Sequence, residues 1–160
     1  MTQPLVIILM GSKADAPHCE KIAAAAGDLG LDVAQHIASA HKTPEHALNL
    51  LRAAEADPRP KVYITVAGRS NALSGFVDGS VSAPVIACPP ASEAFGGADV
   101  FSSLRMPSGI APAVVLDPGN AALLAAKILG LGDASVRARV LAQQQAAQKR
   151  IIGDDQELNP

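Results

Sequence analysis

The sequence predicts a three-layer α/β fold with a central parallel sheet. Short apolar runs rich in β-branched residues recur along the chain, and stretches of helical composition separate them. This alternation is typical of a parallel sheet covered by helices on both faces. The chain has 160 residues, of which 49% are hydrophobic, and a net charge of -2. Such a length and composition predict one domain over residues 1–160 and argue against intrinsic disorder.

The first strand is expected at residues 5–10, because the continuous apolar run LVIILM is typical of a strand buried on both faces. A helix is expected to follow it. Asp15 is the expected N-cap, Pro17 fits the first helical turn, and Gly30 is the expected stop. Strand, loop and helix together form the first unit of the predicted fold.

A second unit of the same kind is expected next, with a strand at 33–38 and a helix at 44–56. Thr43 is the expected N-cap, Pro44 takes the first helical position, and Glu45 complements the helix dipole.

The remainder of the chain predicts three more strands, at 61–67, 84–88 and 111–116, and two helices, at 120–129 and 134–152. The segment 89–109 is longer than a typical connection, and long connections often carry function.

The last predicted helix has an incomplete apolar stripe. Val136, Val140, Ala147 and Ile151 fall near one face, but four glutamines dilute it. We expect this helix to dock on a neighbouring subunit; the alternative is an ordinary helix that covers its own domain.

Composition narrows the classes of partner. The chain has 13 Lys and Arg residues against 15 Asp and Glu residues, and no stretch gathers enough positive charge to neutralise many phosphates. No apolar stretch has the roughly 18 residues of a membrane-spanning helix, and the N-terminus lacks the basic region of a signal peptide. We therefore expect a cytoplasmic protein with no nucleic-acid or membrane partner. Cys19 and Cys88 stand alone in apolar surroundings and are expected to be buried free thiols.

Three loops are expected at the carboxyl ends of strands, where α/β sheets bind ligands: 11–17, 39–43 and 68–75. In the first loop, Gly11 and Ser12 offer backbone N–H groups and a hydroxyl to an anion, although the same pair also suits a purely steric turn. Asp15 could contact a sugar hydroxyl or serve only as the helix cap.

The second loop places the imidazole of His41 beside the ammonium group of Lys42. An imidazole that titrates near neutrality is the usual choice for moving one proton, so His41 is a candidate acid–base residue. A structural role for a loop histidine is the alternative.

The third loop combines a close backbone approach at Gly68 with donors from Arg69, Ser70 and Asn71. Small polar residues beside glycines suit a flat heterocycle. The sequence shows no His, Cys, Asp and Glu grouping with metal-ligand spacing and no GxSxG motif for hydrolysis.

Taken together, these segments resemble the PurE family of purine biosynthesis over about residues 5–130. Four motifs carry the resemblance: Gly11-Ser12 with Asp15, the hexapeptide SAHKTP at 39–44, Ala67-Gly68, and the turn from Met106 to Gly109.

Departures from the family's mutase branch point to its second branch, the direct carboxylases of class II. The chain has Lys42 in place of Arg, the run 69–71 in place of Gly-Ala-Ala, Ala72 in place of a second His, and Ala16 in place of a Trp. The class II enzymes include the animal enzymes.

The resemblance implies a flavodoxin-like subunit in a homo-oligomer, commonly an octamer, with a tetramer as the alternative. It implies carboxylation of aminoimidazole ribonucleotide by carbon dioxide, without ATP, biotin, a metal or another cofactor. By position, His41 matches the catalytic imidazole. The implied substrate-binding residues are Ser12, Asp15, Ser39, Lys42, Gly68, Arg69, Ser70 and Asn71.

Two other readings of the sequence stay open. One is the mutase reaction, in which the carboxyl group arrives as a carbamate on the same ligand. The other is a non-catalytic flavodoxin-like module that binds a nucleotide or a flavin. The low aromatic content, 2% of residues, counts against flavin, whose ring is often sandwiched by Trp or Tyr.

Overall fold

A computed structural model describes residues 2–159 and contains one five-stranded sheet in the order β2-β1-β3-β4-β5. Every neighbouring pair of strands is parallel. The strands are β1 (Leu5–Met10), β2 (Asp32–Ile37), β3 (Lys61–Val66), β4 (Val85–Ala87) and β5 (Ala113–Val114). This is the strand order of flavodoxin-like folds, so the predicted α/β class is confirmed.

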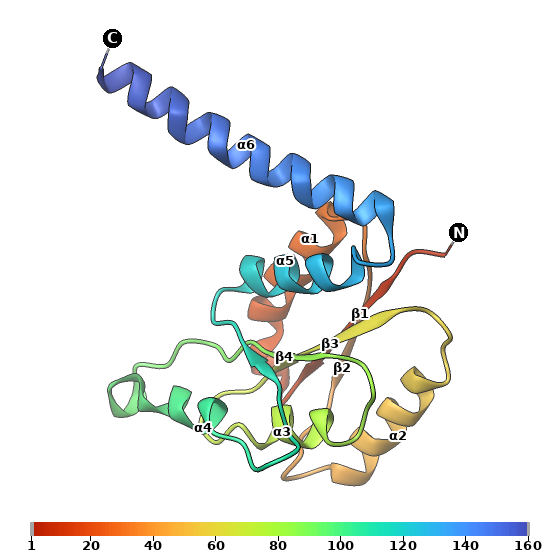
Figure 1. Cartoon of the computed structure of the whole chain (residues 1–160). Coiled ribbons are helices and arrows are strands. Elements are labelled where there is room, and N and C mark those ends of the chain that lie inside the picture. Colours follow the sequence, from red (N-terminus) through yellow and green to blue (C-terminus); the bar gives the residue numbers. More distant parts are fainter. Residues whose placement is uncertain (1, 160) are drawn as a thin grey trace.

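Helices cover both faces of the sheet (Figure 1). Helices α1 and α5 lie on one face, and α2 and α3 lie on the other. The α-helices are α1 (Ala16–Asp28), α2 (Pro44–Glu55), α3 (Ala72–Asp78), α4 (Phe101–Leu104), α5 (Pro118–Leu129) and α6 (Ala134–Leu158). Two 3₁₀ segments complete the set, η1 (Lys13–Asp15) and η2 (Ala94–Val100).

The central strand β1 explains why the sheet needs both helical layers. All six of its residues are buried, so it has no face toward solvent. Val6, Ile8 and Met10 belong to the core under α1 and α5, while the alternate residues of the strand belong to the core under α2 and α3. This division follows from the two-residue period of a strand.

Two elements differ most from the expectation in length, and the helices α3 and α4 and both 3₁₀ segments were not expected. β5 is reduced to Ala113–Val114, because Pro112 has no N–H group to donate to a sheet ladder. α6 continues past Gly153 to Leu158, since a glycine inside a helix costs only about 1 kcal/mol relative to alanine. α3 begins inside the segment that the sequence indicated as a loop.

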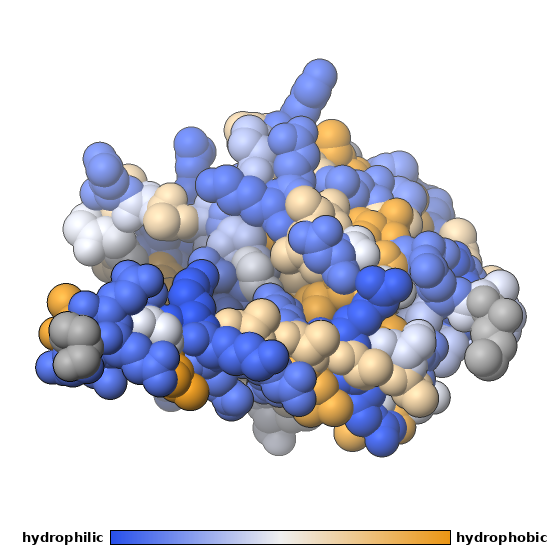
Figure 2. Space-filling view, turned by 90° about the horizontal axis from the view of Figure 1, so that it is seen from above, coloured by the Kyte–Doolittle hydropathy of each residue, from blue (hydrophilic) through white to orange (hydrophobic). Residues whose placement is uncertain are grey.

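Helix α6 is anchored at its start and then leaves the body of the domain (Figure 1). The Asp133 carboxylate caps it by accepting from the N–H groups of Ser135 and Val136, at 2.8 and 3.1 Å. Val136 and Val140 are buried in the core, but the later apolar residues of the helix are exposed. Figure 2, seen from above, shows a surface on this side in which hydrophobic groups are scattered among hydrophilic ones.

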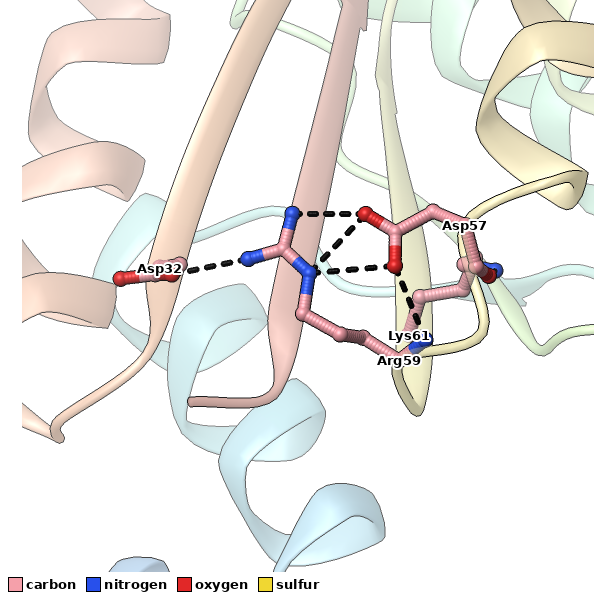
Figure 3. A network of polar contacts seen from close by, with 4 residues as sticks. All are labelled: Asp32, Asp57, Arg59 and Lys61. Carbon is pink, nitrogen blue, oxygen red and sulfur yellow. Dashed lines mark hydrogen bonds and ion pairs between the residues drawn. The ribbon is translucent and has the colours of Figure 1, made fainter. Parts of the chain in front are cut away.

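The amino ends of β2 and β3 are joined by an ion-pair network (Figure 3). The Arg59 guanidinium lies 2.8 Å from the Asp32 carboxylate and 2.7 Å from that of Asp57. Lys61 donates to the backbone carbonyl of Asp57. Hydrogen bonds from the Arg59 side chain hold the pKa of Asp57 down at about 2. The network lies at the amino ends of the strands, and the loops that follow the strands lie at the opposite, carboxyl ends.

Among residues 2–159, no helix is both long and apolar enough to cross a membrane.

Candidate active site

The loops after β1, β2 and β3 enclose a cavity of about 630 Å³. It lies where the strand order reverses around β1, which is where doubly wound sheets bind ligands. Of the nine site residues predicted from sequence, eight line it and Asn71 does not. The eight are Ser12, Asp15, Ser39, His41, Lys42, Gly68, Arg69 and Ser70.

The first wall of the cavity is a tight turn after β1. Asp15 accepts from the Ser12 backbone N–H at 3.0 Å and from the Ser12 hydroxyl at 3.2 Å, both through Oδ2. Asp15 stands at the N-cap of α1, as predicted, but its side chain makes no cap hydrogen bond to that helix. Its carboxylate fixes Ser12 instead, and within the described chain Oδ1 is left for a ligand.

The second wall is the turn that carries His41. The Thr43 hydroxyl accepts from the Ser39 N–H at 3.0 Å and lies 3.3 Å from the Ser39 carbonyl, to which it donates. The Ser39 hydroxyl accepts from the Lys42 N–H at 3.2 Å. Thr43 occupies the N-cap position of α2 without a side-chain cap bond, because its hydroxyl closes this turn. The turn therefore presents His41 and Lys42 at the surface of the cavity.

The third wall follows β3 and contains a backbone outlier. Arg69 has a φ of 59°, in the left-handed region that non-glycine residues rarely adopt. Gly68 lies against Pro90. A Cβ added at Gly68 would lie 3.5 Å from the Cγ of Pro90.

Asn71 is buried beneath this wall and serves the fold. Its Oδ1 accepts from the Ser74 N–H at 3.2 Å, which caps α3, and its Nδ2 donates to the Ser103 hydroxyl at 2.9 Å. Both ends of the amide are thus engaged by the protein. An Asn followed by a helical stretch is an N-cap signal that could have shown this role from the sequence.

The long segment 89–109 supplies a fourth wall that sequence reasoning did not resolve into residues. Pro90, Ala91, Ser92 and Asp99 line the same cavity. A smaller cavity of about 240 Å³ adjoins it, shares Gly68 and these four residues, and is closed by other apolar residues of the chain. The signals in the sequence were the length of the segment and the turn from Met106 to Gly109, and neither pointed to these four residues.

The two cysteines are free and buried, as the sequence predicted. The Cys88 sulfur lies 3.3 Å from Nε2 of His18, and burial raises the pKa of Cys88 to about 12. Burial also raises the pKa of Cys19 to about 11 and lowers that of His18. Both thiols are therefore protonated at neutral pH, and neither is a thiolate nucleophile.

The site consequently offers an exposed imidazole and ammonium group on one side and a guanidinium and hydroxyls on the other. Over residues 2–159, no group of three or more His, Cys, Asp or Glu side chains is arranged to hold a metal ion. Such a set of groups suits a polar, anionic small molecule and one proton transfer.

Comparison with known proteins gives a consistent result. A family model described as AIR carboxylase matches residues 5–150. A phosphoribosylaminoimidazole carboxylase of Treponema denticola is 56% identical over 98% of this chain and 98% of its own length. One from Archaeoglobus fulgidus is 53% identical over 95% of this chain and 83% of its own length. The crystal structure of Treponema denticola PurE matches with a TM-score of 0.97, covering 99% of this chain and all of the other.

Proposed function

The chain belongs to the AIR carboxylase family, and from this premise we propose that it carboxylates aminoimidazole ribonucleotide directly with carbon dioxide. It is a carboxy-lyase of purine biosynthesis, and we propose that the reaction is reversible. The observation that carries the proposal is the cavity of about 630 Å³ that His41 lines together with Lys42 and Arg69, two cationic side chains suited to an anion.

The proposed chemistry requires one carbon–carbon bond and one proton transfer. The exocyclic amine of the substrate donates electron density into the ring and makes ring carbon 4 nucleophilic. The π electron pair at carbon 4 forms the bond to carbon dioxide. Carbon 4 then carries both a hydrogen and the new carboxylate. His41 removes that proton, and the C–H electron pair returns to the ring and restores aromaticity. The acid–base step contributes roughly 10²–10⁴-fold in rate.

The remaining residues bind and orient in this proposal. Ser12, Asp15 and Ser39 would hold the phosphate and ribose, since they line the cavity with two hydroxyls and with a carboxylate that can accept from sugar hydroxyls. Lys42 adds a positive charge at the same end of the cavity. Arg69 and Ser70 would stabilise the carboxylate as it develops. No ATP, biotin or metal is required, because the substrate ring supplies the nucleophile.

We assign the chain to the direct carboxylases rather than to the mutases. The support is the identity of the residues at positions 16, 42 and 69–72, together with the carboxylase names of its relatives. A mutase must hold a carbamate and retain the carbon dioxide that the carbamate releases. A direct carboxylase must admit carbon dioxide from solution.

The test is substrate preference. Purified protein is given aminoimidazole ribonucleotide and either dissolved carbon dioxide or bicarbonate, and initial rates are read before the two species equilibrate. We expect carboxylated product without ATP, at a rate that follows carbon dioxide. Rapid conversion of fresh carbamate with little response to carbon dioxide would make the protein a mutase. A carbamate sample aged until it has decayed to the amine is the control.

We further propose a cytoplasmic homo-oligomer, an octamer or alternatively a tetramer. The support is helix α6, whose distal part exposes apolar side chains that a single subunit leaves uncovered.

A further inference from the structure

We propose that Ser102, on the short helix α4, is a positioning residue that holds Arg69 and Ser70 in the cavity wall. The inference rests on the proposed function, because those two residues are the ones assigned to the developing carboxylate. Ser102 itself does not line the cavity.

The wall at Arg69 needs an external support. A φ of 59° places Arg69 in a conformation that an L-residue other than glycine, asparagine or aspartate seldom adopts. Such strained conformations persist where the surrounding structure enforces them, and they cluster at functional sites.

Ser102 supplies that support through one hydroxyl. It accepts from the Asn71 backbone N–H at 3.0 Å. Its single proton is donated to the Arg69 carbonyl, at 3.0 Å, or to the Asp99 carbonyl, at 2.8 Å. The hydroxyl is thus within hydrogen-bond distance of both residues that flank Ser70, Arg69 and Asn71, and when its proton goes to the Arg69 carbonyl it links the two.

A second, buried contact ties the same helix to the same loop. Ser103 is 1% exposed and Asn71 is 4% exposed, and the Asn71 amide donates to the Ser103 hydroxyl at 2.9 Å. Because this hydrogen bond is buried, it holds α4 against the loop. The exposed Ser102, the neighbour of Ser103 on α4, is thereby kept close to Arg69.

The backbone matters here because the Arg69 side chain is otherwise untethered. Within residues 2–159, no hydrogen bond or ion pair joins its guanidinium to another group. The conformation at its own Cα sets the direction in which the side chain leaves the backbone. Ser12 and Ser39, which are proposed to bind the nucleotide, lie on other loops and do not depend on Ser102.

The first experiment compares Ser102→Ala with Ser102→Thr. Ser102 is exposed, so the threonine methyl group has room and the hydroxyl is retained. Ser102→Ala should lower kcat/KM about five- to tenfold, the effect of one lost hydrogen bond, with KM for the nucleotide within about twofold. Ser102→Thr should recover the activity of the wild type.

The matched control is Ser80→Ala. Ser80 is an exposed serine whose hydroxyl donates to the Phe76 carbonyl at 2.7 Å, at the far end of α3. It should change neither activity nor melting temperature appreciably, and the Ser102 variants should also melt like the wild type.

A double-mutant cycle with Arg69→Gly tests whether Ser102 acts through Arg69. Glycine adopts a positive φ freely and has no guanidinium. In the Arg69→Gly background, Ser102→Ala should therefore cause a smaller loss of kcat than in the wild type, because only the part that acts through Ser70 is left. An equal loss in both backgrounds would overturn the inference, as would a Ser102→Ala enzyme with the kcat of an active wild type. A wild type that does not carboxylate the nucleotide would instead refute the proposed function, and this inference with it.

Discussion

The position of His41 depends on its neighbours more than on its own contacts. Ser39 and Thr43 exchange hydrogen bonds on either side of it, at 3.0 and 3.3 Å, and the following helix begins at Pro44. The imidazole is thus displayed by a closed turn and is exposed to the cavity. Replacing it removes no core packing, so activity and stability can be separated at this residue.

We expect His41→Asn to lower turnover at least about 100-fold and to leave the fold intact, because it removes a proton carrier from an exposed position. The measurements are steady-state kinetics and a thermal melt. His46→Asn is the control: it changes an exposed histidine on α2 that does not line the cavity, and it should retain activity. Activity of His41→Asn within about tenfold of the wild type would remove His41 from the mechanism.

The network in Figure 3 gives a pH-dependent contribution to stability. Hydrogen bonds from Arg59 lower the pKa of Asp57 to about 2 in the folded chain, against roughly 3.9 for a free Asp. Because the folded pKa is the lower one, the contribution is complete above about pH 4 and is lost as the pH falls toward 2.

Asp57→Asn should therefore destabilise the protein at pH 7, and the difference from the wild type should shrink below about pH 4. Urea midpoints from pH 7 to pH 2.5 give the measurement. Arg59→Gln removes the partner and should flatten the same pH window. Parallel curves for the wild type and Asp57→Asn between pH 5 and 2.5 would show that the network carries no such contribution.

Single residues also show how far the sequence could predict the site. Ser12, His41 and Arg69 follow strands directly, so the parallel topology alone brings them to one edge. The capping role of Asn71 was not predicted, because helix α3 is short and contains Gly75, a poor helix former. Asp99 was not found because it comes from a segment without a periodic pattern, whose path depends on tertiary contacts such as those of Ser102.

At the scale of elements, apolar runs were sufficient to find the strands. The exact ends of strands and helices depended on single residues such as proline and glycine. Residues 5–10 were predicted with the bounds that β1 has, because all six are buried. At the edge of the sheet the same signal overestimated β5, where Pro112 interrupts pairing. The first helix ends before Gly30, as predicted, and Gly30 has a φ of 80°; the last helix was predicted to end at residue 152 but continues to Leu158.

Two glycines near the end of α1 should respond oppositely to alanine. Gly27 lies inside the helix with nothing within 4 Å of an added Cβ, so Gly27→Ala should stabilise by about 0.5–1 kcal/mol. Gly30 has positive φ, and its added Cβ would lie 2.7 Å from Nε of Arg139. Gly30→Ala should destabilise by about 1 kcal/mol or more. Urea unfolding measures both, and changes of the same sign would contradict the helix end described here.

At the scale of the whole molecule, the strand order and α6 have separate consequences. The order β2-β1-β3-β4-β5 places the site at the carboxyl ends of the strands. Helix α6 packs only its first two turns on that subunit, through Val136 and Val140. At 25 residues it is about 37 Å long, so most of it extends beyond the domain (Figure 1).

The distal part of α6 supports an assembly because its apolar residues have no cover in one subunit. Ile151, Ile152 and Leu158 are 63%, 57% and 82% exposed. A monomer gains nothing from ordering them, whereas a neighbouring copy would bury them. A deletion after Gly132 would also remove Val136 and Val140 from the core, so a sharper deletion keeps these two valines.

A chain that ends at Gln144 should therefore fold but form a smaller assembly than the full chain, because it retains the core contacts of α6 and loses its distal apolar residues. Light scattering gives the mass, and circular dichroism checks the fold. The full-length double variant Ile151→Ser with Ile152→Ser should shrink the assembly in the same way, since it removes apolar area without shortening the helix. Ala142→Ser with Ala146→Ser, two exposed positions on the opposite face of the helix, is the matched control and should keep the full mass. An unchanged mass for the chain ending at Gln144 would mean that α6 serves its own subunit, and the proposed oligomer would then need another interface.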